Sequence, residues 1–182
     1  MSTENFSALA SAVVAASVAS RWAQAVSEWQ VVSAAYDPAR SGVCVCGQTG
    51  LARLFTIENE RNHRRLSPIG STCVNLFGRA DLDQQVDLFD QLLSLRNAIH
   101  RSERIGLTTE YFSRALLGHL YDAGAFTPDQ WNHGDGRSDY EFLLKTFNKR
   151  NKDEITPAQH RKVSALVSRK VVPAILADDR LR

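Results

Sequence analysis

The sequence predicts a mainly helical α+β protein, with a small cysteine-containing β-hairpin module between an N-terminal helix and a C-terminal helical bundle. Two patterns indicate this class. Apolar residues recur every three to four positions over most of the chain, as in amphipathic helices. Only residues 42–70 alternate apolar and polar side chains between turn residues, as strands do. The three cysteines, Cys44, Cys46 and Cys73, lie in or beside that segment.

Length and composition predict one compact unit. With 182 residues and a hydrophobic fraction of 43%, the chain can bury a core without disulfides. Its expected parts are an N-terminal helix (1–38), a cysteine module (39–80) and a helical bundle (81–182). The net charge of +2 excludes a generally polycationic protein, so any charge-based function depends on where the cations cluster. Three cysteines with a tight Cys-x-Cys spacing favour metal ligation over disulfides, which predicts a cytoplasmic setting.

The N-terminal segment predicts one helix from Asn5 to Ala35. It is rich in alanine, the strongest helix former, and its apolar side chains recur at helical spacing. Pro38 ends this helix, because proline disfavours helical geometry in the residue before it. We do not expect Phe6–Ala19 to be a signal peptide, since a negative rather than a positive charge precedes it. It is also too short and too weakly apolar to span a bilayer.

The cysteine module is expected to contain a cysteine-bearing turn, a hairpin and the start of a helix, in that order. Its predicted parts are a strand at Val43–Cys46, a turn at Gly47–Gly50, a strand at Leu51–Glu58, a loop at 59–63 and a short strand at Leu66–Ile69. A helix then begins at Gly70, with Ser71 or Thr72 as its N-cap and Cys73 in its first turn. This order is the layout of a treble-clef-like zinc finger.

The remainder of the chain predicts helices. They are expected at Asp81–Arg101, from Thr108 or Thr109 to Gly124, at Ser138–Asn148 and at Pro157–Leu176. The last helix should bend or break at Pro173. Residues 127–130 and 156–159 each match a capping box with proline at the first helical position, which predicts a helix start at both places.

Two blocks of the sequence carry a resemblance to known sequences. The first block consists of Cys44–Leu51, Leu54–Asn59 and Pro68–Val74, and the second consists of Phe142–Arg150 and Ile155–Gln159. On these motifs the chain resembles uncharacterised small proteins of actinobacteria and their phages or mobile elements. The resemblance covers most of the chain after Trp29. It implies a phage-related protein and carries over no function.

The cysteines predict a zinc site. Cys44, Cys46 and Cys73 supply three thiolates, and His63 from the hairpin loop is the candidate fourth ligand of a Cys₃His site. In a regular strand Cys44 and Cys46 would share one face, which permits joint ligation. The alternative is that the three cysteines are small buried hydrophobes, as free cysteines often are.

Clustered cations predict nucleic-acid binding. Between Arg137 and Lys170 there are nine lysines and arginines against four acids. Such clusters neutralise phosphates and make binding sensitive to salt. The alternative is a solvated helix face balanced by nearby acids. The candidate contacts are Arg61, Arg64 and Arg65 on the hairpin loop and Lys145, Lys149, Arg150, Lys152, Arg161, Lys162, Arg169 and Lys170 in the last helices.

Two other features compete with this interpretation. Asp81, Asp83, Asp87 and Asp90 form an acidic strip, with no positive charge from Ala80 to Leu95. The strip either recognises a protein partner or, at Asp81 and Asp83 near the helix start, complements the helix dipole. His133 and Asp135, with Asp139 and Glu141 close in sequence, either hold a divalent ion of a nuclease or form a turn and helix caps. No phosphate-cradling glycine-rich loop, nucleophile elbow or HExxH motif is present.

The sequence therefore favours a non-enzymatic nucleic-acid-binding accessory protein of phage or mobile-element type. In this hypothesis the basic C-terminal helices contact phosphates, and a zinc-stabilised module holds the basic hairpin loop. The alternative is a protein–protein interaction factor that modulates a host or defence complex. No membrane partner is expected.

Overall fold

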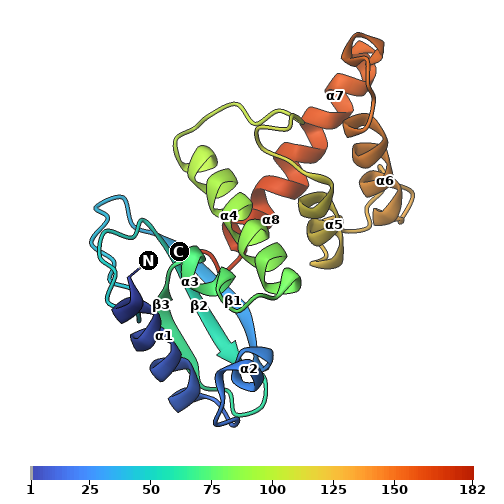
Figure 1. Cartoon of the computed structure of the whole chain (residues 1–182). Helices are drawn as coiled ribbons and strands as arrows, with labels where there is room; N and C mark the ends of the chain where they lie inside the picture. Colours follow the sequence, from blue (N-terminus) through green and yellow to red (C-terminus); the bar gives the residue numbers. More distant parts are fainter. Residues whose placement is uncertain (1) are drawn as a thin grey trace. The chain divides into compact units, whose positions relative to one another are not determined.

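The computed structural model describes residues 2–182 and has the predicted mainly helical α+β architecture (Figure 1). The chain divides into two compact units, one formed by the residues up to Leu93 with Asp179–Arg182, the other by Ser94–Asp178. The elements are α1 (Thr3–Ala16), α2 (Trp22–Ala25), the 3₁₀ turn η1 (Val26–Glu28), β1 (Trp29–Tyr36), β2 (Arg53–Asn59), β3 (Arg65–Ile69), α3 (Ser71–Asn75), α4 (Ala80–His100), α5 (Arg114–Asp122), α6 (Gly136–Phe147), the 3₁₀ turn η2 (Lys152–Glu154), α7 (Pro157–Leu166), the π-helical segment η3 (Val167–Val171) and α8 (Val172–Ala177).

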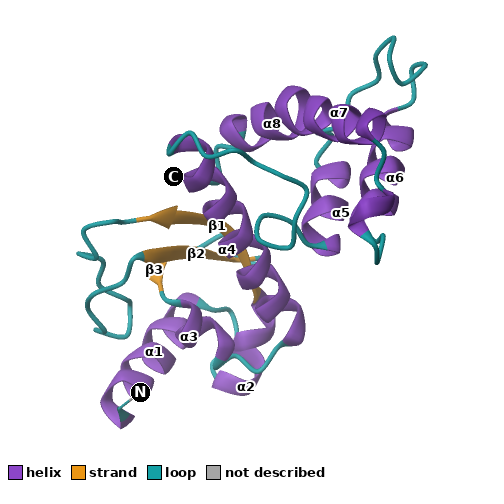
Figure 2. Cartoon of the chain, turned by 90° about the horizontal axis from the view of Figure 1, so that it is seen from above, coloured by secondary structure: helices purple, strands orange, loops and turns teal. Residues whose placement is uncertain are grey.

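The first unit is built on a three-stranded antiparallel sheet with the order β1-β2-β3 (Figure 2). Phe55 on β2 pairs with Ala34 on β1 and with Ile69 on β3, and all three residues are buried. Helix α1 packs beside β3. The first half of α4 lies against β1, where the amide of Val31 donates a hydrogen bond to Gln85 Oε1 at 2.7 Å.

The prediction of one helix from Asn5 to Ala35 is wrong: α1 ends at Ala16, the short α2 (Trp22–Ala25) is the next α-helical segment, and a strand begins at Trp29. The buried carboxylate of Glu28 accepts hydrogen bonds from the amides of Val18 and Ala19, which bind a side chain instead of continuing the helix. The segment from Trp29 onward becomes β1, because pairing with β2 along its length outweighs the helical preference of its alanines.

The last four residues complete the sheet. Leu181 forms a parallel bridge with Ala34, and the amides of Ala34 and Tyr36 donate hydrogen bonds to the carbonyls of Arg180 and Arg182 at 2.9 and 2.8 Å. The Leu181 side chain is 1% exposed. The outer edge of β1 is therefore covered by the C-terminal end of the chain.

The hairpin of the cysteine module is confirmed, and two details around it are wrong. Strands β2 and β3 match the predicted pair, and α3 begins where a helix was expected. Val43–Cys46 is not a strand but part of a turn, because Gly47 has a φ of +88° and its amide closes back onto the carbonyl of Cys44. The N-cap of α3 is Gly70, and neither Ser71 nor Thr72 caps the helix with its side chain.

The second unit is helical, and its core consists of apolar side chains from each of its helices. Tyr121 on α5 stacks on Tyr140 on α6 with ring centroids 4.7 Å apart. The predicted capping box is confirmed at the start of α7, where Thr156 and Gln159 bond each other's backbone amides. The expected interruption near Pro173 is the π-helical segment η3, directly before α8.

Two predicted helix starts in the second unit are wrong. Helix α5 begins at Arg114, with the hydroxyl of Ser113 as its cap, so the segment from Thr108 to Phe112 is a turn. No helix begins at residues 127–130. There the carboxylate of Asp129 accepts hydrogen bonds from the amides of Trp131 and Asn132, which produces a turn with the same local sequence signature as a helix cap.

Candidate functional site

A tight turn places Cys44 and Cys46 together. The amide of Gly47 donates to the carbonyl of Cys44, and the amide of Cys44 donates to the carbonyl of Gln48, both at 2.8 Å. The amide of Val45 donates to the carbonyl of Pro68 on β3 at 3.0 Å, so the turn is attached to the hairpin. Both thiols are consequently held on the inner side of the turn, where they are 3% exposed.

The first turn of α3 brings in the third cysteine. The Sγ of Cys73 lies 3.6 Å from the Sγ of Cys44 and 3.4 Å from the Sγ of Cys46. All three sulfur atoms lie within 4.8 Å of one another. The amide of Gly70 points at the sulfur of Cys44 from 3.4 Å, as amides do around metal-bound thiolates. This thiol cluster, Cys44, Cys46 and Cys73, can hold a metal ion.

The pKa shifts of Cys46 and Cys73 go in opposite directions. Burial would raise the pKa of Cys46, but hydrogen bonds from the amide of Gln48 and from the two neighbouring thiols hold it below its usual value. Burial and the same neighbours raise the pKa of Cys73. Three thiolates do not coexist here without a cation, because each added negative charge in a buried site opposes the next. Full deprotonation therefore requires a bound cation.

An open pocket of about 400 Å³ lies over the thiol cluster. All three cysteines line it, together with Arg40, Gln48 and the backbone around Ser71 and Thr72. Among its described lining residues there is no histidine and no carboxylate. The protein side of the site thus consists of three sulfur ligands that face a pocket.

The structure does not bring His63 to the thiol cluster. His63 lies in the loop between β2 and β3, where it has a φ of +58° and its side chain is 79% exposed. Its Nδ1 atom lies 3.4 Å from Oε1 of Glu58, at the opposite end of β3 from Gly70 and α3. The proposed Cys₃His set is therefore not assembled.

The arginines of the hairpin loop are partly engaged within their own unit. Arg61 lies 3.5 Å from Glu28, Arg65 forms an ion pair with Glu58 at 2.6 Å, and Arg64 donates to the carbonyl of Ala15 at 3.1 Å. The side chains of Arg61 and Arg65 remain largely exposed, at 62% and 67%. Surface ion pairs of this kind are weak, so these cations can still face an anionic partner.

The basic residues of the last helices fall into two groups. The first group is engaged within the protein. Lys170 is buried and binds Asp129 and Asp139, and Lys162 lies 3.6 Å from Asp139 and over the ring of Phe142. Lys149 and Lys152 donate to backbone carbonyls in and after α6.

The second group is free to bind an anion. Within residues 2–182, the side chains of Lys145, Arg150, Arg161 and Arg169 are exposed and form no ion pair or hydrogen bond. They extend over α6, α7 and η3 of the second unit. The sequence predicts eight phosphate-contacting cations in this region, and these four are available for such contacts.

The competing candidates have structural roles. Asp90 on α4 forms an ion pair with Arg53, and Asp81 at the helix start forms one with Arg79. Asp135 is the N-cap of α6 and accepts a hydrogen bond from the amide of Arg137. Among residues 2–182, the thiol cluster is the one group of three or more metal-ligating side chains whose ligand atoms meet.

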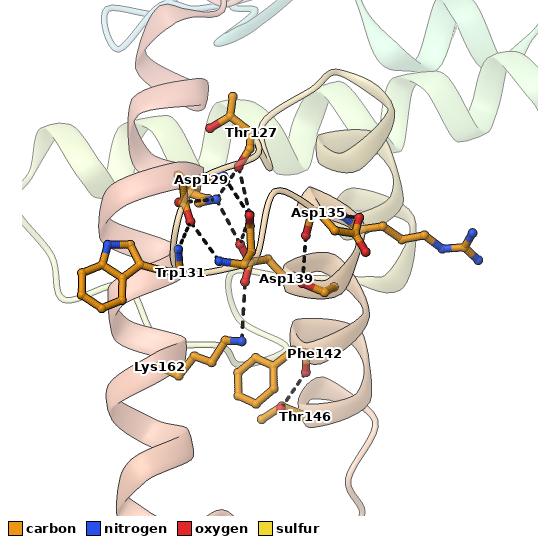
Figure 3. Close-up of polar contacts among 12 residues, drawn as sticks. Thr127, Asp129, Trp131, Asp135, Asp139, Phe142, Thr146 and Lys162 are labelled. Carbon is orange, nitrogen blue, oxygen red and sulfur yellow. Dashed lines mark hydrogen bonds and ion pairs between the residues drawn. The ribbon is translucent and has the colours of Figure 1, made fainter.

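A pocket around Trp131 is not apparent from the sequence. It has a volume of about 510 Å³ and is lined by Trp131, Lys162, Arg169 and the buried pair Asp139 and Lys170. Figure 3 labels Trp131, Asp139 and Lys162 of this lining. These residues come from a turn, from α6 and from the last helices, so no sequence motif joins them. The signal in the sequence is that Trp131, like Phe147 and Tyr140, is an aromatic residue near the clustered cations, which could stack a base or pack in the core.

Comparisons with protein-family models, with curated proteins and with solved structures found no match for this chain. No helix within residues 2–182 combines the length and the apolar character that crossing a bilayer requires.

Proposed function

We propose that this chain is a non-enzymatic nucleic-acid-binding accessory protein of phage or mobile-element type, acting in the cytoplasm, whose hairpin module is stabilised by zinc. The observation that supports nucleic-acid binding is the set of four exposed cations of the second unit without a partner among residues 2–182, and the three buried thiols support the zinc. The basic loop of the same hairpin and the four free cations of the second unit provide two candidate contact surfaces for phosphates.

Zinc is the metal that best fits the thiol cluster. Two sulfur ligands at a zinc–sulfur distance of about 2.3 Å lie about 3.8 Å apart in a tetrahedral site. The distances of 3.6 and 3.4 Å between Cys73 and its two partners are close to that value. Three thiolates also select soft or borderline metals over magnesium and calcium, which prefer oxygen. Water would complete the coordination, because the described lining of the pocket offers no histidine and no carboxylate.

The metal is tested by measuring the zinc content of the purified protein and its melting curve with and without a strong chelator. We expect about one zinc per chain and a lower melting temperature after chelation, because the ion links the turn, the hairpin and α3. Protein without metal, with an unchanged melting curve in chelator, would contradict the zinc assignment.

Nucleic-acid binding is tested by fluorescence anisotropy of labelled single- and double-stranded DNA and RNA at several salt concentrations. The test variant is Arg150→Gln with Arg161→Gln, and the matched control is Arg21→Gln with Arg104→Gln, which also removes two exposed charges. If both test cations contact phosphates, the test variant lowers the slope of log affinity against log salt by about 1.4 for single strands. The control leaves the slope unchanged.

The absence of binding to all four nucleic acids at low salt would overturn the proposed function. The protein–protein interaction factor would then be the remaining candidate.

A further inference from the structure

We infer that the pocket around Trp131 is a binding site for one nucleotide of a single-stranded nucleic acid, with the base stacked on Trp131 and the phosphate held by Arg169. This inference rests on the proposed function. It adds that the protein prefers single strands and that Trp131 contacts a base.

The first observation is the exposure of Trp131. Its side chain is 73% exposed, the highest value among the large apolar side chains of the described residues. A tryptophan side chain gains more than most others from leaving water, so an indole left in solvent is available to a ligand. Figure 3 shows the indole of Trp131 pointing away from Asp129 and Asp139.

The second observation is that this exposed residue is held in place. The carboxylate of Asp129 accepts hydrogen bonds from the amides of Trp131 and Asn132 at 2.7 and 3.0 Å. The buried side chain of Asn132 donates in turn to the carbonyl of Thr127 and to Asp139. These hydrogen bonds fix the backbone of the turn before and after Trp131. A fixed backbone lowers the entropic cost of stacking a ring on the indole.

The third observation concerns the floor of the pocket. Lys170, with its side chain 8% exposed, donates to the carbonyl of Thr127 at 2.6 Å and lies 2.9 Å from Asp129 and 3.0 Å from Asp139. All three protons of its ammonium group are thus used. Lys170 belongs to η3, and single π-helical turns within α-helices are frequent at functional sites.

The charge of the pocket then decides the class of ligand. Its lining contains three cations, Lys162, Arg169 and Lys170, and two carboxylates, Asp129 and Asp139, so one positive charge is left over. Arg169 has no hydrogen-bond or ion-pair partner among residues 2–182, whereas Lys162 lies 3.6 Å from Asp139. An unpartnered guanidinium beside a planar aromatic surface suits a planar base that carries a phosphate.

A single strand fits this arrangement better than a duplex. In a duplex both faces of each base are covered by its neighbours, whereas a base of a single strand can leave the stack and pack on an aromatic side chain. The pocket volume of about 510 Å³ is of the size that small-molecule sites use, which is sufficient for one nucleotide unit.

The test compares wild-type protein with Trp131→Ala, Trp131→Phe and Arg169→Gln, with Arg104→Gln as the charge control. Each protein is titrated against a labelled single-stranded oligonucleotide, the matching duplex and the free mononucleotide. Because Trp131 is exposed, we expect these variants to keep the wild-type circular dichroism spectrum and melting temperature.

We expect Trp131→Ala to weaken single-strand binding about 5- to 150-fold and Trp131→Phe to weaken it much less, because phenylalanine retains an aromatic face. Duplex binding should change little. The single strand should also quench tryptophan fluorescence in the wild type and quench it less in Trp131→Phe, since the other two tryptophans, the half-buried Trp22 and the buried Trp29, do not line the pocket.

The outcomes separate the inference from the proposed function. If the wild type binds nucleic acid but Trp131→Ala binds the single strand as tightly as the wild type does, the inference fails and the function stands. If the protein binds the mononucleotide as tightly as the oligonucleotide, the ligand of the pocket is a free nucleotide rather than a strand. This result would also overturn the inference. If no nucleic acid binds, the proposed function fails as well.

Discussion

Glu28 is the residue whose placement most affects the first unit. Its buried carboxylate binds the amides of Val18 and Ala19 after α1 and accepts a hydrogen bond from Asn59 Nδ2 at the end of β2. Burial would raise the pKa of Glu28, but these hydrogen bonds and the nearby Arg61 guanidinium hold it below the usual 4.5. One carboxylate thus joins the end of α1, the start of β1 and the end of the β2 strand.

Replacing Glu28 with glutamine should destabilise the fold and remove part of its acid sensitivity. The pKa of Glu28 is lower in the folded state, so its contribution to stability is present above pH 4.5 and is lost as the pH falls below that value. Melting curves from pH 7 to pH 2 should show a shallower loss of stability in Glu28→Gln than in the wild type. The exposed Glu60, changed to glutamine, serves as the control. Parallel pH profiles in the two variants would rule out this role.

Cys73 is the central ligand of the thiol cluster, because its sulfur lies within 3.6 Å of both partners. We expect Cys73→Ser to lower the zinc content from about one per chain to near zero, since two thiolates from one turn do not complete a site. His63→Ala should leave the content unchanged, because His63 does not reach the cluster. Metal analysis by mass spectrometry separates these cases. Loss of zinc in His63→Ala would restore the Cys₃His set.

At the scale of elements, the start of α6 depends on a close approach that only glycine permits. A Cβ on Gly136 would lie 1.8 Å from the carbonyl oxygen of Phe126. The segment before α6 folds back onto this helix and brings Phe126 into the core. The local sequence predicts a helix start at residue 138. It does not reveal that the backbone of Phe126 passes close to residue 136, where only glycine fits.

Gly136→Ala should therefore destabilise the second unit by about 1–3 kcal/mol or more, because the backbone of Phe126 must move. The matched control is Gly118→Ala on α5, where the nearest atom to the new Cβ is the Tyr140 hydroxyl at 3.9 Å. That change should be neutral or stabilise by about 1 kcal/mol, through the higher helix propensity of alanine. Urea denaturation curves of the two variants measure the difference. A neutral Gly136→Ala would show that the contact relaxes without cost.

Helix and strand predictions differed in success for a physical reason. Helices α4 and α7 were predicted well, because their apolar spacing and the capping box of Thr156 act within the element itself. Strand β1 was predicted as helix because its alanines and valines are compatible with both states, and the partner that selects the strand, β2, lies far along the sequence. The turn at Asp129 was predicted as a helix start since the same side chain can cap either structure.

At the scale of the whole molecule, the first unit consists of two stretches that are distant in sequence, the residues up to Leu93 and Asp179–Arg182. The chain leaves the sheet region through α4, forms the second unit and returns at Asp179–Arg182 to pair with β1. The boundary between the units lies inside α4, so no linker rich in glycine or proline marks it in the sequence. The unit that carries the thiol cluster is complete only when the last four residues are present.

Leu181→Ala should lower the free energy of unfolding of the first unit by about 2–5 kcal/mol, because the side chain is buried. Leu176→Ala is the matched control, since that side chain is 41% exposed. Hydrogen exchange at the amides of Ala34 and Tyr36, which donate to the C-terminal segment, should accelerate in the first variant and not in the second. Unchanged exchange at these amides would mean that the terminal segment adds no stability.

The sequence by itself determined the mainly helical α+β class, the hairpin of β2 and β3, and the three cysteines as the candidate metal ligands. These features follow from periodicity, turn chemistry and ligand type, which are local properties. The tertiary structure decided that β1 is a strand, that His63 lies away from the thiols, that Lys170 is buried between two aspartates, and that Trp131 stands beside a cationic pocket. Each of these depends on residues distant in sequence, whose pairing and burial are set only when the core forms.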